Sequence, residues 1–191
     1  MLKIPVYLLA AVLGLFSSAV SAEGEAYQID LLTFSQTMPN TEIFEQTVSQ
    51  ISWPADLTEL SAYKEADNKT LAASYAALSN DAAYRPILYA AWVQHAPAGG
   101  LSAPVHIQGV DGDLDGYVQI RQGQGLQMTV DLELSSKRRS GSGAASAQAA
   151  DLYVGDKAVI YRLNEKRPVK LNEIYYFDHP KFGVIVKISP L

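Results

Sequence analysis

The chain has 191 residues, 48% of them hydrophobic, which is enough for one domain with its own hydrophobic core. Its 15 basic and 20 acidic residues give a formal net charge of −5, which argues against nucleic acid as the main partner. The chain contains no cysteine, and this excludes disulfide bonds, a thiol nucleophile and a thiolate metal site.

The N-terminal residues 1–22 are expected to be a signal peptide. A lysine precedes the apolar stretch 4–16, and Val20 and Ala22 occupy the positions before the cleavage site where a signal peptidase prefers small residues. The apolar stretch is too short to span a bilayer comfortably, so we favour cleavage over a membrane anchor. An exported chain without cysteine fits a bacterial periplasm better than a eukaryotic secretory route. We therefore expect a periplasmic protein, exported by a cleavable signal peptide, with one domain over residues 23–191 and no membrane span after cleavage.

The sequence of the first part of this domain predicts two strands and two helices. Alternating apolar residues predict a strand over residues 27–34. Apolar residues spaced three and four apart predict a short helix over 41–51, which ends before the Trp53-Pro54 pair. The clearest helix is 67–80, because it begins with residues that can cap a helix and carries one apolar stripe. Residues 84–94 are predicted to form an aromatic-rich strand.

Three more strands are predicted after a glycine-containing loop. They cover residues 105–108, 114–121 and 126–134. The last of them alternates apolar and polar residues without a fault, which predicts one face in the core and the other in water, as in an antiparallel sheet.

The chain then changes composition. Residues 135–150 are rich in serine, glycine and alanine, and we expect a flexible loop instead of a domain boundary. Residues 158–163 and 169–177 are expected to form a hairpin around the polar residues 164–167, and residues 183–188 close the domain. The predicted fold is α+β, a single domain with a mostly antiparallel sheet of about seven or eight strands and one or two helices.

Asp111, Asp113 and Asp115 alternate with other residues as in the first half of a calcium loop. The twelfth position of that loop, however, is Gln122, which cannot supply a bidentate carboxylate, and the flanks are predicted strands. Aspartate and glycine are also ordinary turn residues, so we favour a hairpin turn. The three histidines have no ligand spacing between them, and we expect neither a metal nor a cofactor.

Asp178 and His179 stand next to each other, and a carboxylate beside a histidine can orient a general base. Neighbouring residues on a strand point to opposite faces, and the chain has no Gly-x-Ser-x-Gly motif to supply a nucleophile. We favour the interpretation that Asp178, His179 and Pro180 form the turn of a hairpin. A hydrolase that uses Asp178 and His179 is therefore the least favoured interpretation, and no catalytic residue is assigned.

Candidate ligand-binding residues are chosen by chemistry. Aromatic side chains can stack on sugar rings, although they are also ordinary sheet residues. Arginines can pair with carboxylates of a peptide or glycan, although they more often lie on a solvated hairpin face. The candidates are Trp92, Arg162, Arg167, Tyr176, Asp178 and His179.

Four stretches occur in an order known from one protein family. They are residues 27–34, the Trp53-Pro54 pair, residues 84–88 together with 91–94, and residues 173–186. The last stretch is the most specific, and it contains Tyr175-Tyr176-Phe177-Asp178-His179-Pro180. On these residues the chain resembles the CsiV family, the periplasmic peptidoglycan-binding proteins of Gram-negative bacteria that are named for cell-shape integrity.

The resemblance implies a non-enzymatic periplasmic protein that binds peptidoglycan and supports cell-wall synthesis and cell shape. It also implies a second partner, a lipoprotein that activates a class A penicillin-binding protein. The alternative is a periplasmic protein-interaction scaffold without glycan affinity, which would dock through a strand edge or through residues 137–150.

Overall fold

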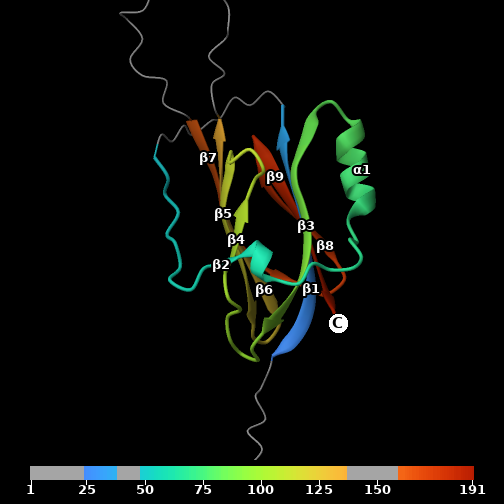
Figure 1. Cartoon of the computed structure of the whole chain (residues 1–191), viewed down its shortest axis with the longest axis vertical. Coiled ribbons are helices and arrows are strands. Elements are labelled where there is room, and N and C mark those ends of the chain that lie inside the picture. Colours follow the sequence, from blue (N-terminus) through green and yellow to red (C-terminus); the bar gives the residue numbers. More distant parts are fainter. Residues whose placement is uncertain (1–23, 38–47, 137–158) are drawn as a thin grey trace, which may run out of the picture.

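The computed structural model describes residues 24–37, 48–136 and 159–191. Within these ranges, two sheets face each other across one core, and a helix lies on the outside of the first sheet (Figure 1). The strands are β1 (Glu25–Gln36), β2 (Thr58–Glu59), β3 (Tyr84–Ala96), β4 (Val105–Gln108), β5 (Leu114–Gln122), β6 (Leu126–Ser136), β7 (Val159–Val169), β8 (Ile174–His179) and β9 (Phe182–Pro190). The helices are the 3₁₀ turn η2 (Leu60–Ala62) and the α-helix α1 (Ala72–Asn80).

The strand order is β3-β1-β9-β8 in the first sheet and β2-β4-β5-β6-β7 in the second. Neighbouring strands are antiparallel, except that the two-residue strand β2 pairs with β4 in parallel. The predicted single α+β domain with mostly antiparallel strands is confirmed. Its strands are divided between two sheets because each sheet has an apolar face that must be covered.

The core receives side chains from both sheets. Ile29 and Val186 of the first sheet, and Met128 and Val130 of the second, are fully buried. In both sheets these core residues alternate with residues on the opposite face, as the period of two in a strand requires. The predicted strands over 27–34, 84–94, 105–108, 114–121 and 126–134 are confirmed within β1, β3, β4, β5 and β6.

One predicted hairpin is wrong. β7 runs straight through residues 164–167 and pairs with β6 along its whole length, while β8 pairs with β9 in the other sheet. The polar residues 164–167 do not turn, because the long strand β6 supplies ladder partners beyond them and their side chains remain partly or fully exposed. The closing hairpin of β8 and β9 is present, but its turn is shorter than predicted. Asp178 and His179 still pair with Gly183 and Phe182, so the turn lies at Pro180 and Lys181.

The helix predictions need correction. Of the predicted helix 41–51, residues 41–47 lie outside the described residues and residues 48–51 are not helical. The predicted helix 67–80 begins only at Ala72. Residues 1–22, and residues 137–150 of the predicted loop, lie outside the described residues, whereas residues 135–136 belong to β6.

A buried carboxylate explains why α1 starts late. Asp30 is 0% exposed and lies on the face of β1 opposite to the core residue Ile29. Its Oδ1 accepts a hydrogen bond of 2.6 Å from the Thr70 backbone N–H, and its Oδ2 accepts one of 2.8 Å from Gln28 Nε2. The same glutamine amide donates to the carbonyl of Asn68 at 2.6 Å. These contacts hold the chain against β1 before the helix begins.

Replacement of this carboxylate should destabilise the fold. We expect Asp30→Ala to lower the free energy of unfolding by about 1.5–3 kcal/mol, because it removes two hydrogen bonds to a buried charged group. The matched control is Asp67→Ala, whose side chain is 93% exposed and should change that free energy by less than about 0.5 kcal/mol. Urea denaturation measures both, and equal effects of the two variants would contradict the role of Asp30.

Candidate functional site

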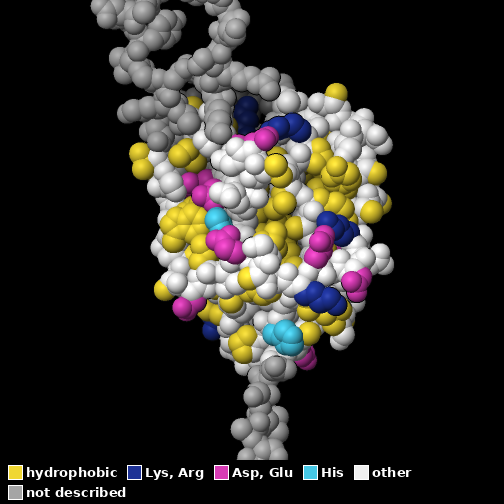
Figure 2. All heavy atoms as spheres, in the orientation of Figure 1, with side chains coloured by type: hydrophobic (Ala, Val, Ile, Leu, Met, Phe, Trp, Pro, Cys, Tyr) yellow, Lys and Arg dark blue, Asp and Glu magenta, His cyan; other side chains and the backbone are white. Residues whose placement is uncertain are grey.

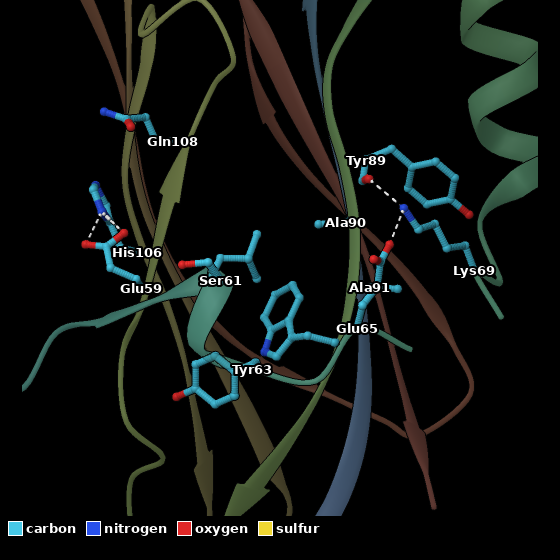
Figure 3. Close-up of a pocket in the computed structure, with 12 residues that line it drawn as sticks. Glu59, Ser61, Tyr63, Glu65, Lys69, Tyr89, Ala90, Ala91, His106 and Gln108 are labelled. Carbon is cyan, nitrogen blue, oxygen red and sulfur yellow. Dashed lines mark hydrogen bonds and ion pairs between the residues drawn. The ribbon is translucent and has the colours of Figure 1, made fainter. Parts of the chain in front are cut away.

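A groove opens where β3, the edge strand of the first sheet, faces β2 and β4 of the second sheet (Figure 3). Its volume is about 480 Å³. Figure 2 shows this face of the molecule, on which hydrophobic side chains lie in the middle and charged and histidine side chains lie around them. The lining residues are Glu59, Leu60, Ser61, Tyr63, Glu65, Lys69, Tyr89, Ala90, Ala91, Trp92, His106 and Gln108. We call this feature the inter-sheet groove.

The two sheets approach each other on either side of the groove. On one side, residues 64–66 extend the edge of β3, since Ala66 N donates to Ala91 O at 2.9 Å and Lys64 O accepts from Val93 N at 3.0 Å. On the other side, Arg85 of β3 forms an ion pair of 3.2 Å with Asp113 in the loop between β4 and β5. The groove is therefore an opening that these contacts frame.

Trp92 is fixed beneath the groove. Its side chain is 1% exposed, and its Nε1 donates to Gln94 Oε1 at 3.1 Å. The amide of Gln94 donates in turn to Ala103 O at 2.6 Å and to the hydroxyl of Tyr63 at 3.3 Å. The predicted ligand-binding residue Trp92 thus lines the groove from the core, while Tyr63 lies nearer the surface.

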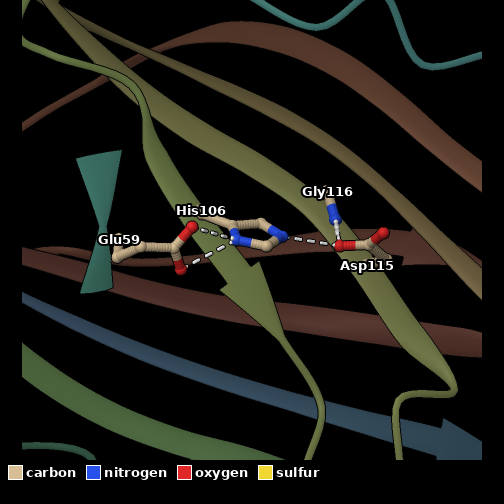
Figure 4. Close-up of polar contacts among 4 residues, drawn as sticks. All are labelled: Glu59, His106, Asp115 and Gly116. Atoms are coloured by element: carbon tan, nitrogen blue, oxygen red, sulfur yellow. Dashed lines mark hydrogen bonds and ion pairs between the residues drawn. The ribbon is translucent and has the colours of Figure 1, made fainter. Parts of the chain in front are cut away.

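His106 lines the groove together with Glu59, and its ring also contacts Asp115, which is not a lining residue (Figure 4). Its Nδ1 lies 2.9 Å from both carboxylate oxygens of Glu59, and its Nε2 lies 2.7 Å from Asp115 Oδ1. This arrangement, which we call the His106 clamp, links β2, β4 and β5. Burial lowers the pKa of His106, but the hydrogen bonds to Asp115 and Glu59 raise that pKa by more, so it lies above its ordinary value.

The opposite wall carries a paired positive charge. Lys69 Nζ lies 3.0 Å from Glu65 Oε1 and 5.4 Å from the ring centroid of Tyr89. Tyr89 also stacks on Tyr75 of α1, with the ring centroids 5.3 Å apart. The groove therefore presents a cation, carboxylates, hydroxyls and an amide around a partly apolar floor.

Trp53 lies beside the His106 clamp, on the outer face of the second sheet. Its ring centroid is 5.6 Å from that of His106 and 6.5 Å from that of Tyr117, and the residue is 43% exposed. Trp53 is not among the six candidates predicted from the sequence, although both tryptophans can stack on sugar rings. Its position before Pro54, outside every predicted strand, was the available signal that it is not a core residue.

Arg162 is engaged with another strand. Its Nε and Nη2 donate to the two oxygens of Asp131 on β6, each at 2.8 Å, and Glu133 Oε1 lies 4.0 Å from Nε. Glu133 also accepts a hydrogen bond of 2.8 Å from the Gln50 backbone. Asp131 is 1% and Glu133 6% exposed, because Arg162 and the chain near Gln50 cover them. The prediction that this face of β6 lies in water is therefore wrong at these two residues, whereas Gln127 and Thr129 on the same face are half-buried.

Arg167 lies on the side of the molecule away from β2 and β3. There β7 is the edge strand of the second sheet and β8 is the edge strand of the first. Its guanidinium carbon is 4.3 Å from the ring centroid of Phe177, and its Nη2 is 2.6 Å from Glu165 Oε1. A cation over an aromatic ring stabilises this junction. The residue is therefore remote from the inter-sheet groove.

Asp178 and His179 do not form an acid–base pair. The Tyr176 hydroxyl donates to Asp178 Oδ1, whereas His179 packs between the rings of Tyr161 and Phe182 and its Nδ1 accepts from the Lys181 backbone at 3.2 Å. Burial lowers the pKa of His179 below its ordinary value. The two residues thus belong to the closing hairpin, as favoured from the sequence, but they end β8, and the turn itself lies at Pro180 and Lys181.

The candidate calcium carboxylates separate in the fold. Asp111 and Asp113 lie near Arg85, with distances of 3.9 Å and 3.2 Å to its guanidinium, whereas Asp115 belongs to the His106 clamp. Among the described residues, no group of three or more histidine and carboxylate side chains is arranged to hold a metal ion. In the same part of the chain, no helix has the length and apolar character needed to cross a membrane.

The six predicted ligand-binding residues are therefore spread over the molecule. The structure brings Trp92 to the groove, Arg162 to the outer face of the second sheet and Arg167 to the far junction. The other three lie on β8, in the hairpin that β8 forms with β9. Their role in binding stays a prediction. The groove residues Glu59, Lys69 and His106 were not among them, because they come from distant parts of the sequence.

The His106 clamp predicts a defined dependence on pH. The pKa of His106 is raised above about 6.5, the value expected in the unfolded chain. The clamp should therefore contribute its full stabilisation below about pH 6.5 and lose it as the pH rises through the folded-state pKa. NMR titration should find the pKa of His106 above and that of His179 below about 6.5.

Variants check this assignment. Glu59→Gln should bring the pKa of His106 down, and His106→Gln should destabilise the protein more at pH 5.5 than at pH 8.5. A pKa of His106 that does not respond to Glu59→Gln, or a destabilisation that grows with pH, would contradict the clamp.

Comparison with known proteins adds one finding. The model of a family described as "Peptidoglycan-binding protein, CsiV" matches residues 54–191, which is well over half of the chain and includes every groove residue. No curated protein and no solved structure gives a significant match. The chain belongs to the CsiV family of peptidoglycan-binding proteins.

Proposed function

We propose that this protein binds peptidoglycan through the inter-sheet groove, and that it supports cell-wall synthesis and cell shape in the periplasm without catalysing a reaction. The observation that carries the proposal is the family match, because the family is described by its binding of peptidoglycan. The groove lies within the matched region and has the size and chemistry of a ligand site. The two following observations support its assignment.

The first observation is the size of the groove. Its volume of about 480 Å³ lies within the range of roughly 300–1,000 Å³ that is typical of ligand pockets. Such a space accommodates a short piece of glycan or stem peptide. The groove is also framed by contacts within the protein, so it is formed before a ligand arrives.

The second observation is the mixture of polar groups on the groove walls. Peptidoglycan presents hydroxyl groups, amides and carboxylates, and these need both acceptors and donors. Glu59 and Glu65 supply acceptors, while Lys69 supplies a donor. Tyr63 adds a hydroxyl next to an aromatic face, which suits a ligand with apolar and polar sides.

The positions of the histidines support a binding role over a catalytic one. Both ring nitrogens of His106 contact carboxylates, and the Nδ1 of His179 is engaged by the backbone of its own turn. A general base must reach the proton that it removes. Among the described residues, no hydrogen bond joins a histidine ring to the hydroxyl of a serine or threonine.

The location and the second partner are part of the proposal. Export by the N-terminal residues 1–22 would bring the domain to the compartment that contains peptidoglycan. A lipoprotein that activates a class A penicillin-binding protein is proposed as a protein partner on the resemblance alone. Capture of that lipoprotein by the purified domain tests this part separately.

Co-sedimentation with isolated sacculi tests the proposed function. Purified mature protein should pellet with sacculi at micromolar concentration. Ser61→Trp puts a bulky side chain at an exposed position of the groove, and it should weaken binding about tenfold or more by steric exclusion of the ligand. Ala73→Trp, at an exposed position of α1, is the matched control and should bind as the wild type does.

Absence of pelleting by the wild-type protein would contradict peptidoglycan binding and would favour the protein-interaction scaffold. Equal binding by Ser61→Trp and Ala73→Trp would leave peptidoglycan binding intact but would remove the groove from it.

A further inference from the structure

We propose that Trp53 and the His106 clamp form a saccharide subsite, which receives a neutral N-acetylated sugar ring of the glycan strand and not the stem peptide. This inference rests on the proposed function, since it names the part of peptidoglycan that is recognised beside the groove. Trp53 would supply the apolar platform, and Glu59 and Asp115 would accept hydrogen bonds from sugar hydroxyls.

The ring of Trp53 is exposed to solvent. The chain has two tryptophans, and Trp92 is 1% exposed whereas Trp53 is 43% exposed. The rings of His106 and Tyr117 meet the indole at interplanar angles of 85° and 46°. Neither neighbour lies parallel against the indole, so neither covers it as a stacked ring would. A large apolar surface is thus kept in solvent, although burial of that surface would be favourable.

The Trp53 ring is held in a fixed position, so it forms a rigid platform. Pro54 restricts the backbone of Trp53, and the Gln50 N–H is anchored 2.8 Å from Glu133 Oε1 on β6. The two ring contacts hold the side chain from the sheet side. A platform that is ordered before binding loses little conformational entropy when a ligand arrives. The exposed ring is therefore built for contact.

Hydrogen-bond acceptors lie near the Trp53 ring. His106 contacts Trp53 through its ring and holds Glu59 and Asp115 through its two nitrogens. These carboxylates remain accessible, because the Glu59 side chain is 66% and that of Asp115 is 48% exposed. A carboxylate has about four lone-pair sites, so each can still accept from a ligand hydroxyl. Apolar ring and acceptors together match the two sides of a pyranose.

The negative charge of the protein favours the uncharged glycan over the stem peptide. The chain has a formal net charge of −5, and the clamp adds two carboxylates for one histidine. A stem peptide carries carboxylates of its own, which this surface would repel. An N-acetylated sugar is uncharged and has hydroxyls to donate. The local electrostatics therefore favour the glycan.

Fluorescence of the wild-type protein tests the subsite directly. Because Trp92 is buried, acrylamide should quench mainly Trp53. A tetramer of β-1,4-linked N-acetylglucosamine should protect Trp53, lower the quenching constant at least twofold and do so saturably. A soluble stem peptide should give no such protection. Protection by the peptide but not by the tetramer would overturn the saccharide assignment.

Calorimetry of variants provides the second readout. Trp53→Ala should weaken tetramer binding at least tenfold, whereas Ile174→Ala, at an exposed apolar residue of the edge strand β8, should leave it unchanged. Trp53→Phe keeps a smaller platform and should lie between them, which keeps the test valid if the alanine variant fails to fold. Equal affinity of Trp53→Phe and the wild type, with no fluorescence protection, would overturn the subsite.

The outcomes separate the subsite from the proposed function. Wild-type protein that pellets with sacculi but neither binds the tetramer nor depends on Trp53 would sink the subsite alone. Failure of the wild type in both assays would overturn the subsite together with the proposed function.

Discussion

The constraint on which the rest of the structure depends is that two sheets share one core without closing at both edges. At the β7 and β8 edges, Arg167 lies over Phe177 and joins the sheets. At the other side, β3 faces β2 and β4 across the inter-sheet groove. The groove is thus a consequence of how the sheets pack. Its floor is the core itself, because Trp92 belongs to both.

The polar groups around this opening have a structural and a proposed functional role at once. β2 has two residues and would be weakly held by its backbone pairing to β4 alone. The His106 clamp adds a charged contact from Glu59 and extends it to Asp115 on β5. The same contacts orient carboxylates toward solvent beside Trp53. A ligand that met these groups would find them already positioned.

Sequence patterns predicted the strands well but their pairing poorly, and there is a physical reason for this difference. Alternation along 126–134 depends on local residues alone, and it correctly predicted a strand. Pairing of β7 with β6 depends on a long-range ladder, so the polar residues 164–167 were wrongly taken for a turn. The site was missed for a similar reason, since Glu59 and His106 are 47 residues apart. The CsiV resemblance, by contrast, is confirmed over residues 54–191.

The most direct test of the central claim is a map of backbone amide shifts by NMR when soluble peptidoglycan fragments are added. The account predicts that the perturbed amides cluster at residues 59–65, 89–92 and 106–108, which line the groove, and extend to Trp53. Perturbations confined to the closing hairpin at Asp178 and His179, or spread over α1 with the groove unaffected, would contradict it.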